Sequence, residues 1–224
     1  MISIETLSFS YPDGNFRLEI PRLTLEPGEK VAVVGPSGTG KTTLLNLIAG
    51  ISVPTSGSVR VDDQTVSDMN DASRRALRAT KIGFVFQDFA LLEYLNAREN
   101  ILFPYRIAAG IRLDSQARAR AEQLALSCGL ESKLDRRPGA LSHGEQQRVA
   151  LCRALVMNPR LVLADEATGN LDPANKTDIL DLLFARCSDH GATLLAVTHD
   201  HALLPRFDRV IDFSDFRHSQ GGTA

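Results

Sequence analysis

A glycine-rich stretch near the N-terminus constrains the fold of this chain more than any other feature. Residues 35–42 read Gly-Pro-Ser-Gly-Thr-Gly-Lys-Thr, which matches the pattern G-x-x-x-x-G-K-[ST]. A short apolar run, Lys30–Gly35, precedes the loop, and a helical pattern over Lys41–Ala49 follows it. A strand, a glycine-rich loop and a helix in this order form a phosphate-binding loop, because the glycines let backbone N–H groups surround phosphate oxygens at the positive end of the helix.

The loop pattern also assigns a role to its two last residues. We expect Lys41 to place a positive charge on the β- and γ-phosphates of a nucleotide, and the hydroxyl of Thr42 to bind Mg²⁺. The alternative is a glycine-rich turn without a ligand, but the strand, the loop, the lysine and the helix together argue against it. The residues expected to bind the nucleotide here are Gly35, Pro36, Ser37, Gly38, Thr39, Gly40, Lys41, Thr42 and Thr43.

The distribution of apolar residues predicts an α/β fold. The first 25 residues alternate between apolar and polar side chains, which predicts an antiparallel β hairpin formed by Ser3–Phe9 and Phe16–Ile20. Short continuous apolar runs then alternate with helical stretches, which is typical of a mostly parallel sheet buried on both faces. The expected buried strands are Lys30–Gly35, Ile82–Phe86, Leu161–Ala164 and Thr193–Val197, with a last strand at Val210–Phe213, and the expected helices are Lys41–Ala49, Ala72–Ala79 and Pro173–Cys187.

Residues 88–157 differ from the rest, because no buried strand is evident in them. Helical patterns cover Asp114–Cys128 and Ser142–Met157. We therefore predict a P-loop NTPase core made of residues 1–87 and 158–224, with an inserted α-helical subdomain at 88–157. The whole chain, 1–224, is expected to be a single domain.

Composition narrows the function. The formal net charge is −2, from 25 basic and 27 acidic residues, so bulk charge does not favour a nucleic-acid partner. No apolar stretch approaches the roughly 18 residues of a transmembrane helix, and the N-terminus does not resemble a secretion signal. Cys128, Cys152 and Cys187 are widely spaced and form no metal-binding pattern, which predicts buried, reduced thiols in a cytosolic compartment.

Two carboxylates follow the strand Leu161–Ala164. We expect Asp165 to hold the Mg²⁺ shell and Glu166 to act as a general base on an attacking water. His199 follows the strand Thr193–Val197, and strand ends of a parallel sheet line the ligand crevice, so it should reach the γ-phosphate. Acidic residues are common at strand ends, and a lone histidine is more often an ordinary loop residue. The functional interpretation of these three residues therefore depends on the phosphate-binding loop in the same chain.

Further motifs follow in an order typical of one family. Leu141-Ser142-His143-Gly144-Glu145-Gln146-Gln147-Arg148 resembles a signature sequence that other P-loop kinases and GTPases lack. Together with the remaining matches it makes the chain similar, along essentially its whole length, to the ATP-binding subunit of an ABC transporter. The other matches are Tyr11 (the aromatic that stacks on adenine), Gln87 (the Q-loop), Gly169–Asp172 (the D-loop) and His199 (the switch histidine).

The resemblance implies a mechanism that the spacing alone does not. Two copies of the chain would face each other head to tail, and Ser142 and Gly144 of one copy would contact the γ-phosphate bound by the other. ATP would hold this homodimer together until hydrolysis releases it. Glu166, His199 and Gln87 would be the catalytic residues, and Mg²⁺ would be bound by Thr42, Gln87 and Asp165.

This sequence departs from the family pattern at two positions. His143 stands where the signature usually has glycine, and Ala167 stands where proline is common after the catalytic glutamate. We expect the His143 side chain to point away from the nucleotide and Ala167 to change only the stiffness of the loop.

Loop sequences favour one branch of the family, which comprises the ATPases for lipoprotein release, macrolide and peptide export, and cell-division signalling. They are Ala167–Asp172 and Gln87–Asn100. The main alternative is an importer ATPase for amino acids or other small solutes. A soluble ABC ATPase acting on DNA or ribosomes is disfavoured, because the chain has one phosphate-binding loop, no heptad run and no zinc-binding spacing, and a plain P-loop kinase is disfavoured by the signature.

The implied partners are a membrane-spanning permease subunit, which would select the transported substrate, and a second copy of the chain, with no nucleic acid. We expect a peripheral protein on the cytoplasmic face of the inner membrane, docked through the segment after Gln87 by a groove for a short helix of the permease. Some of the apolar residues of this segment must belong to the core. The candidates are Phe89, Leu91, Leu92, Tyr94, Leu95 and Phe103.

Overall fold

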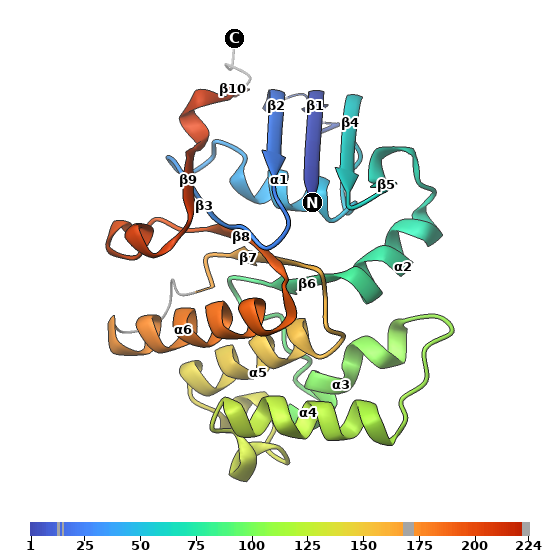
Figure 1. Ribbon diagram of the computed structural model, residues 1–224, viewed down its shortest axis with the longest axis vertical. Coiled ribbons are helices and arrows are strands. Elements are labelled where there is room, and N and C mark those ends of the chain that lie inside the picture. The colour runs from blue at the N-terminus through green and yellow to red at the C-terminus, as the bar shows by residue number, and fades with distance from the viewer. Residues whose placement is uncertain (13, 15, 168–172, 221–224) are drawn as a thin grey trace.

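The computed structural model describes residues 1–12, 14, 16–167 and 173–220, and its strands form two five-stranded sheets (Figure 1). One sheet lies at the top of the view, and the other crosses the middle of the molecule. Most of the helices lie on the far side of the second sheet from the first. The predicted D-loop residues, 169–172, lie outside the described residues.

The first sheet is antiparallel and contains the predicted hairpin. β1 and β2 pair with Ile2 opposite Leu25 and Ser10 opposite Arg17, which confirms the antiparallel hairpin. The sheet is larger than expected, because β4 pairs with the free edge of β1, β5 extends β4, and β10 pairs with β2. Its order is β10 (Arg217–Gln220), β2 (Phe16–Leu25), β1 (Ile2–Ser10), β4 (Ser56–Val61) and β5 (Gln64–Thr65).

The second sheet is parallel throughout its described strands. The four predicted apolar runs are adjacent strands in it, and the last predicted strand forms its edge. Alternate side chains enter different cores: Val162 and Ala164 face one, and Leu161 and Leu163 the other. Burial on both faces explains why these strands are continuously apolar. The order is β6 (Ile82–Val85), β7 (Leu161–Asp165), β8 (Thr193–Val197), β3 (Lys30–Val34) and β9 (Arg209–Asp212).

Helix α1 (Lys41–Ile48) joins the two sheets. Its apolar side chains, among them Leu44, Leu45 and Ile48, are fully buried and share a core with residues of both sheets. Helix α2 (Asp71–Lys81) leads into β6, and the side chain of Asn70 caps its N-terminus by accepting a hydrogen bond from Ser73 N.

The other core lies between the parallel sheet and four helices, α3 (Ala97–Ile107), α4 (Ser115–Ser127), α5 (His143–Leu155) and α6 (Pro173–His190). Asn96 with Glu99, and Ser142 with Glu145, form capping boxes that start α3 and α5 at defined residues. The described residues 88–157 contain α3, α4, α5 and short 3₁₀ turns, and no strand. The division of the chain into subdomains stays a prediction.

Among the described helices, none combines the length and the apolar character needed to cross a lipid bilayer. Cys128, Cys152 and Cys187 are free and buried, as predicted.

Gly83 allows β6 to pack closely against α5. A Cβ atom at this position would lie 2.3 Å from the carbonyl oxygen of Ala154. Because backbone atoms cannot yield as a flexible side chain can, we expect Gly83→Ala to lower the free energy of unfolding by about 2 kcal/mol. The control is Gly139→Ala, whose added Cβ would meet nothing within 4 Å. Equal denaturation midpoints for the two variants would contradict this account.

Candidate nucleotide-binding site

The glycine-rich loop wraps around the side chain of Lys41. The ammonium group donates hydrogen bonds to the carbonyl oxygens of Gly35, at 2.8 Å, and of Pro36, at 2.7 Å. Gly40 has φ of +101°, and a Cβ there would lie 2.6 Å from the ring of Phe16. The backbone conformation therefore favours glycine at this position, and any Cβ atom would also displace the ring of Phe16.

Helix α1 begins inside this loop. The backbone N–H of Leu44 bonds to the carbonyl of Gly40 at 2.8 Å, so the N–H groups of Lys41, Thr42 and Thr43 precede the first hydrogen bond within the helix. Such groups, with the helix dipole, favour phosphate. They open into a pocket of about 360 Å³ lined by Tyr11, Phe16, Ser37, Gly38, Gly40, Lys41, Thr42, Thr43, Glu166 and Val197.

Aromatic rings form one side of the pocket. The hydroxyl oxygen of Tyr11 lies 3.0 Å from Oγ1 of Thr43, which fixes the ring relative to α1. Phe9 packs edge-on against the Tyr11 ring at 4.9 Å between centroids, and Phe16 lies on it at 5.8 Å. Tyr11 is partly exposed, so part of its surface is available to a base.

The two carboxylates at the end of β7 have different partners. Burial raises the pKa of Asp165 above its ordinary value, although a hydrogen bond with Thr42 and the charge of Lys41 act in the opposite direction. Glu166 instead pairs with His199, whose Nδ1 lies 3.0 Å from Oε1 of the glutamate. The two neighbouring side chains thus diverge at the strand end, which suits two separate roles.

Glu166 is held in an unusual backbone conformation. Its φ of +48° lies in the left-handed region, which non-glycine residues rarely adopt. The hydrogen bond from its N–H to the carbonyl of Val197, at 3.0 Å, ties the residue to the end of β8. Strained residues of this kind cluster at functional sites, so the conformation adds support for a role of Glu166.

Eight of the predicted site residues do not line this pocket. Gly35, Pro36 and Thr39 belong to the glycine-rich loop itself, and Asp165 and His199 interact with Thr42 and Glu166, which do line it. The other three lie elsewhere. Gln87 is exposed in the turn after β6, and Ser142 and Gly144 lie at the start of α5, where Ser142 Oγ accepts a hydrogen bond from Glu145 N at 3.3 Å. The pocket also contains two residues that the sequence analysis missed, Phe16 and Val197. Phe16 is the first residue of a predicted strand and carries no chemical signal of its own.

The site as built has the parts of a P-loop ATPase: a phosphate-binding loop, a buried carboxylate bonded to its threonine, and a glutamate–histidine pair at the neighbouring strand ends. The family model described as "ABC transporter" matches residues 18–169. The chain belongs to the ABC transporter family and is one of its ATP-binding, ATP-hydrolysing subunits.

Individual relatives agree with this assignment. The chain is 42% identical over 220 residues to the lipoprotein-releasing system ATP-binding protein LolD of Syntrophotalea carbinolica, covering 97% of this chain and 96% of that protein. It is 41% identical to the macrolide export ATP-binding/permease protein MacB of Syntrophobacter fumaroxidans, covering 96% of this chain but only 30% of that protein. The dimeric post-hydrolysis structure of the cassette MJ0796 with ADP and Pi superimposes with a TM-score of 0.85, at 34% identity, covering 95% of this chain and 94% of that one.

The position of Lys41 predicts a loss of ATP affinity in Lys41→Ala. Removing the ammonium group leaves phosphate charge unmatched, so we expect Kd for ATP to rise by roughly 10- to 100-fold. Titration with a fluorescent ATP analogue measures this. Lys81→Ala is the control, because Lys81 ends α2 and does not line the pocket. Equal Kd values for Lys41→Ala and wild type would rule out the assigned role.

Proposed function

We propose that this chain powers a membrane-spanning partner of the lipoprotein-release and macrolide-export branch of the family. The names of the relatives LolD and MacB support this branch, as do the loop sequences after Gln87 and Glu166. An importer ATPase for amino acids or other small solutes is the second candidate. The single observation that carries the function is the convergence of the P-loop with Asp165 and with the Glu166–His199 pair.

Mg²⁺ fits the donor groups of the site. Thr42 and Asp165 supply a hydroxyl and a carboxylate oxygen that already lie within hydrogen-bonding reach of each other, and Mg²⁺ prefers oxygen ligands. Gln87 is the proposed third protein ligand. When bound, the cation would neutralise charge on the β- and γ-phosphates. Lys41 and the first N–H groups of α1 would bind and orient the same phosphates.

Glu166 is the proposed general base. Its carboxylate lies at the pocket wall, where it would accept a proton from a water beside the γ-phosphate. The contact with His199 holds this carboxylate in one orientation, and the bond from Glu166 N to Val197 holds its backbone. His199 would thus orient the base and, from the same strand end, reach the γ-phosphate.

A second copy of the chain would complete the site. Ser142 and Gly144 start α5 away from the pocket of their own chain, as a role at the pocket of the other copy requires. The Ser142–Glu145 capping box fixes the start of this helix, and Lys133 pairs with Glu145 at 2.8 Å. Tyr11, which lines the same pocket, would stack on adenine.

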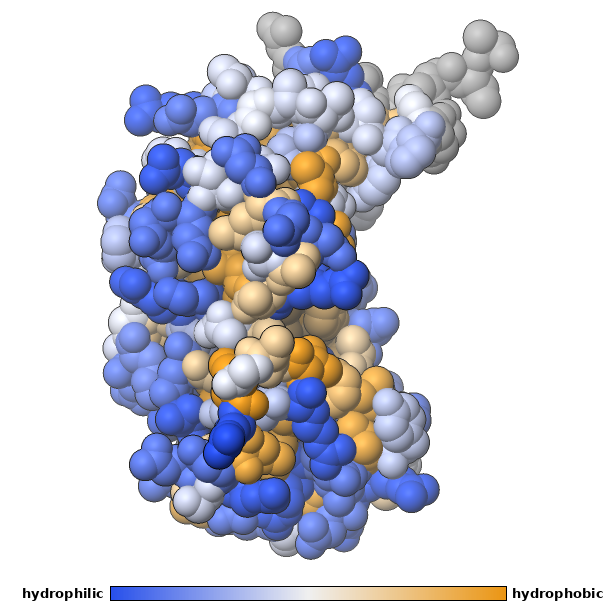
Figure 2. All heavy atoms as spheres, turned by 90° about the vertical axis from the view of Figure 1, so that its right-hand side faces the viewer, coloured by the Kyte–Doolittle hydropathy of each residue, from blue (hydrophilic) through white to orange (hydrophobic). Residues whose placement is uncertain are grey.

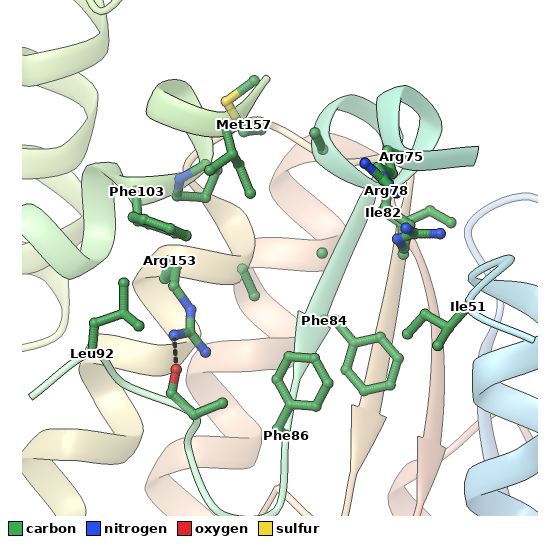
Figure 3. Close-up of a pocket in the computed structure, with 16 residues that line it drawn as sticks. Ile51, Arg75, Arg78, Ile82, Phe84, Phe86, Leu92, Phe103, Arg153 and Met157 are labelled. Atoms are coloured by element: carbon green, nitrogen blue, oxygen red, sulfur yellow. Dashed lines mark hydrogen bonds between the residues drawn. The ribbon is translucent and has the colours of Figure 1, made fainter. Parts of the chain in front are cut away.

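A groove of about 480 Å³ is the proposed docking site for the membrane subunit; we call it the transmission groove. It lies between α2, β6, α3 and α5, and Figure 2 shows apolar side chains gathered among hydrophilic ones on this face. Figure 3 shows Phe84 and Phe86 side by side in it, with their rings 4.2 Å apart. The groove is lined by Ile51, Arg75, Arg78, Ala79, Ile82, Gly83, Phe84, Phe86, Ala90, Leu92, Phe103, Pro104, Ile107, Arg153, Ala154 and Met157.

The chemistry of the groove indicates its occupant. Arg75, Arg78 and Arg153 are its only charged lining residues among the parts of the chain that the structure describes. An apolar surface whose charged lining residues are all cations fits a short amphipathic helix that carries an acidic side chain. We assign this helix to the cytoplasmic side of the membrane subunit, which would place the chain at the cytoplasmic face of the membrane.

The structure divides the predicted docking residues. Leu92 and Phe103 line the transmission groove, whereas Phe89 and Leu95 are buried. Leu91 packs against the core, and Tyr94 is 69% exposed but does not line the groove.

Glu166→Gln tests the proposed mechanism. The amide has nearly the same shape but does not accept the proton, so turnover should fall at least about 100-fold while ATP affinity stays within about twofold of wild type. With ATP present, the variant should accumulate as a dimer in size-exclusion chromatography with light scattering. Hydrolysis at a rate near wild type would contradict the assignment of the base.

Leu92→Asp tests the docking site. A carboxylate in the apolar groove should weaken docking, leave ATP hydrolysis by the isolated chain within about twofold of wild type, and reduce recovery of the chain with membranes. The control is Leu126→Asp on α4, at an apolar side chain that is 56% exposed and outside the groove. A photo-crosslinking residue at position 92, but not at 126, should capture a multi-helix membrane protein. Crosslinking of only soluble proteins at position 92 would contradict the proposal.

A further inference from the structure

The turn that contains Gln87 is closed by its own backbone. The N–H of Phe89 bonds to the carbonyl of Phe86 at 3.1 Å, and the N–H of Ala90 bonds to that of Asp88 at 2.7 Å. Phe89 and Ala90 have φ of +61° and +47°, two successive non-glycine residues in the left-handed region. Such a pair is costly, so it persists only where surrounding contacts hold it.

Arg153 supplies such contacts. Its two terminal nitrogens donate to consecutive carbonyls, Nη1 to Ala90 at 2.5 Å and Nη2 to Phe89 at 2.6 Å. The planar guanidinium thus binds the two left-handed residues through two hydrogen bonds at once, an arrangement we call the fork. Figure 3 shows Arg153 reaching from α5 beside the transmission groove, with a dashed line on one of these bonds.

The side chain of Phe89 makes a second contact between the turn and α5. Its ring is buried, and its centroid lies 6.1 Å from that of His143, the first residue of the helix. The turn is therefore attached to α5 through the backbone at Arg153 and through the ring near His143. The same helix begins next to Ser142, the residue proposed to act at the partner copy's nucleotide.

The charge of Arg153 is satisfied mainly by these carbonyls. No carboxylate of the described chain lies within 4.0 Å of its guanidinium nitrogens. Burial lowers the pKa of Arg153 to about 10, with the charge of Asp88 acting in the opposite direction. The group nevertheless stays protonated at neutral pH, so its hydrogen bonds persist there.

We propose that Arg153 is a positioning residue for ATP hydrolysis, which holds the Phe86–Ala90 turn so that Gln87 reaches the nucleotide site. This inference rests on the proposed function of Gln87 as an Mg²⁺ ligand. Ala90 and Arg153 both line the transmission groove, so an occupant of the groove contacts the two groups that fix the turn. Arg153 therefore also connects groove occupancy to the position of Gln87.

A double-mutant cycle between positions 87 and 153 tests the proposal on the full chain. Arg153→Met keeps an apolar stem and removes the fork. We expect it to lower kcat roughly tenfold and to raise the Mg²⁺ concentration for half-maximal activity, with KM for ATP within about twofold of wild type. In a Gln87→Ala background, the same change should lower kcat by less than about twofold, because the residue that Arg153 positions is already gone.

Two further variants separate positioning from stability. Arg153→Lys keeps a cation but not the fork, and should recover part of the lost kcat. Arg120→Met is the matched control: Arg120 is a partly buried arginine that donates to the hydroxyl of Tyr105, at 2.8 Å, and lies outside the groove. We expect Arg120→Met to leave kcat and the Mg²⁺ dependence unchanged, whatever it does to the melting temperature.

The experiment separates a failure of the positioning role of Arg153 from a failure of the proposed function. Equal falls in kcat on Arg153→Met in the wild-type and Gln87→Ala backgrounds would overturn the positioning role, as would a lower melting temperature with unchanged kcat and Mg²⁺ dependence. If Arg153→Met does not fold, the cycle is run with Arg153→Lys, and the same criterion of non-additivity applies. A wild-type chain without Mg²⁺-dependent ATP hydrolysis would instead overturn the proposed function itself.

Discussion

The contact between Thr42 and Asp165 is the interaction on which the arrangement of the site depends. Thr42 lies at the start of α1, after β3, whereas Asp165 ends β7, and β8 lies between these two strands in the sheet. The contact therefore spans a strand and links the phosphate-binding loop to the acidic edge of the sheet. The same burial that raises the pKa of Asp165 strengthens its attraction for a cation, because screening by water is weaker there.

The register of the parallel strands then places Glu166 beside His199. Asp165 pairs with Val197 across β7 and β8, and the next residue, Glu166, bonds through its N–H to the carbonyl of Val197. His199 follows two residues later and meets the Glu166 carboxylate at 3.0 Å. A shift of one residue between the strands would separate the pair, so the apolar packing that fixes this register also positions the proposed base.

Local patterns predicted the parts of the molecule that depend on local physics. The apolar runs predicted the strands of the parallel sheet. The loop motif and the strand ends indicated Lys41, Asp165, Glu166 and His199 as candidates, and the structure brings these residues close together. The sequence analysis did not predict the three additional strands of the antiparallel sheet, because they are short or lie far along the chain from the strands with which they pair. The role of Arg153 was not predicted for a related reason. The sequence shows only an arginine inside a helix, and its two carbonyl partners lie 63 and 64 residues away in the chain.

The identity of residue 153 follows from what such a link has to do. The two carbonyls of the Phe89–Ala90 pair both accept from one guanidinium, which serves them in a single plane, whereas an ammonium group has no such fixed geometry. Burial lowers the pKa of Arg153 to about 10 and still leaves it charged. A lysine, with an ordinary pKa of about 10.4, would be brought closer to neutrality by the same burial. A side chain that bonds to main-chain carbonyls is coupled to the backbone of the turn itself, so in the proposed role a contact in the groove that moves Arg153 would also move the peptide units of the turn that contains Gln87.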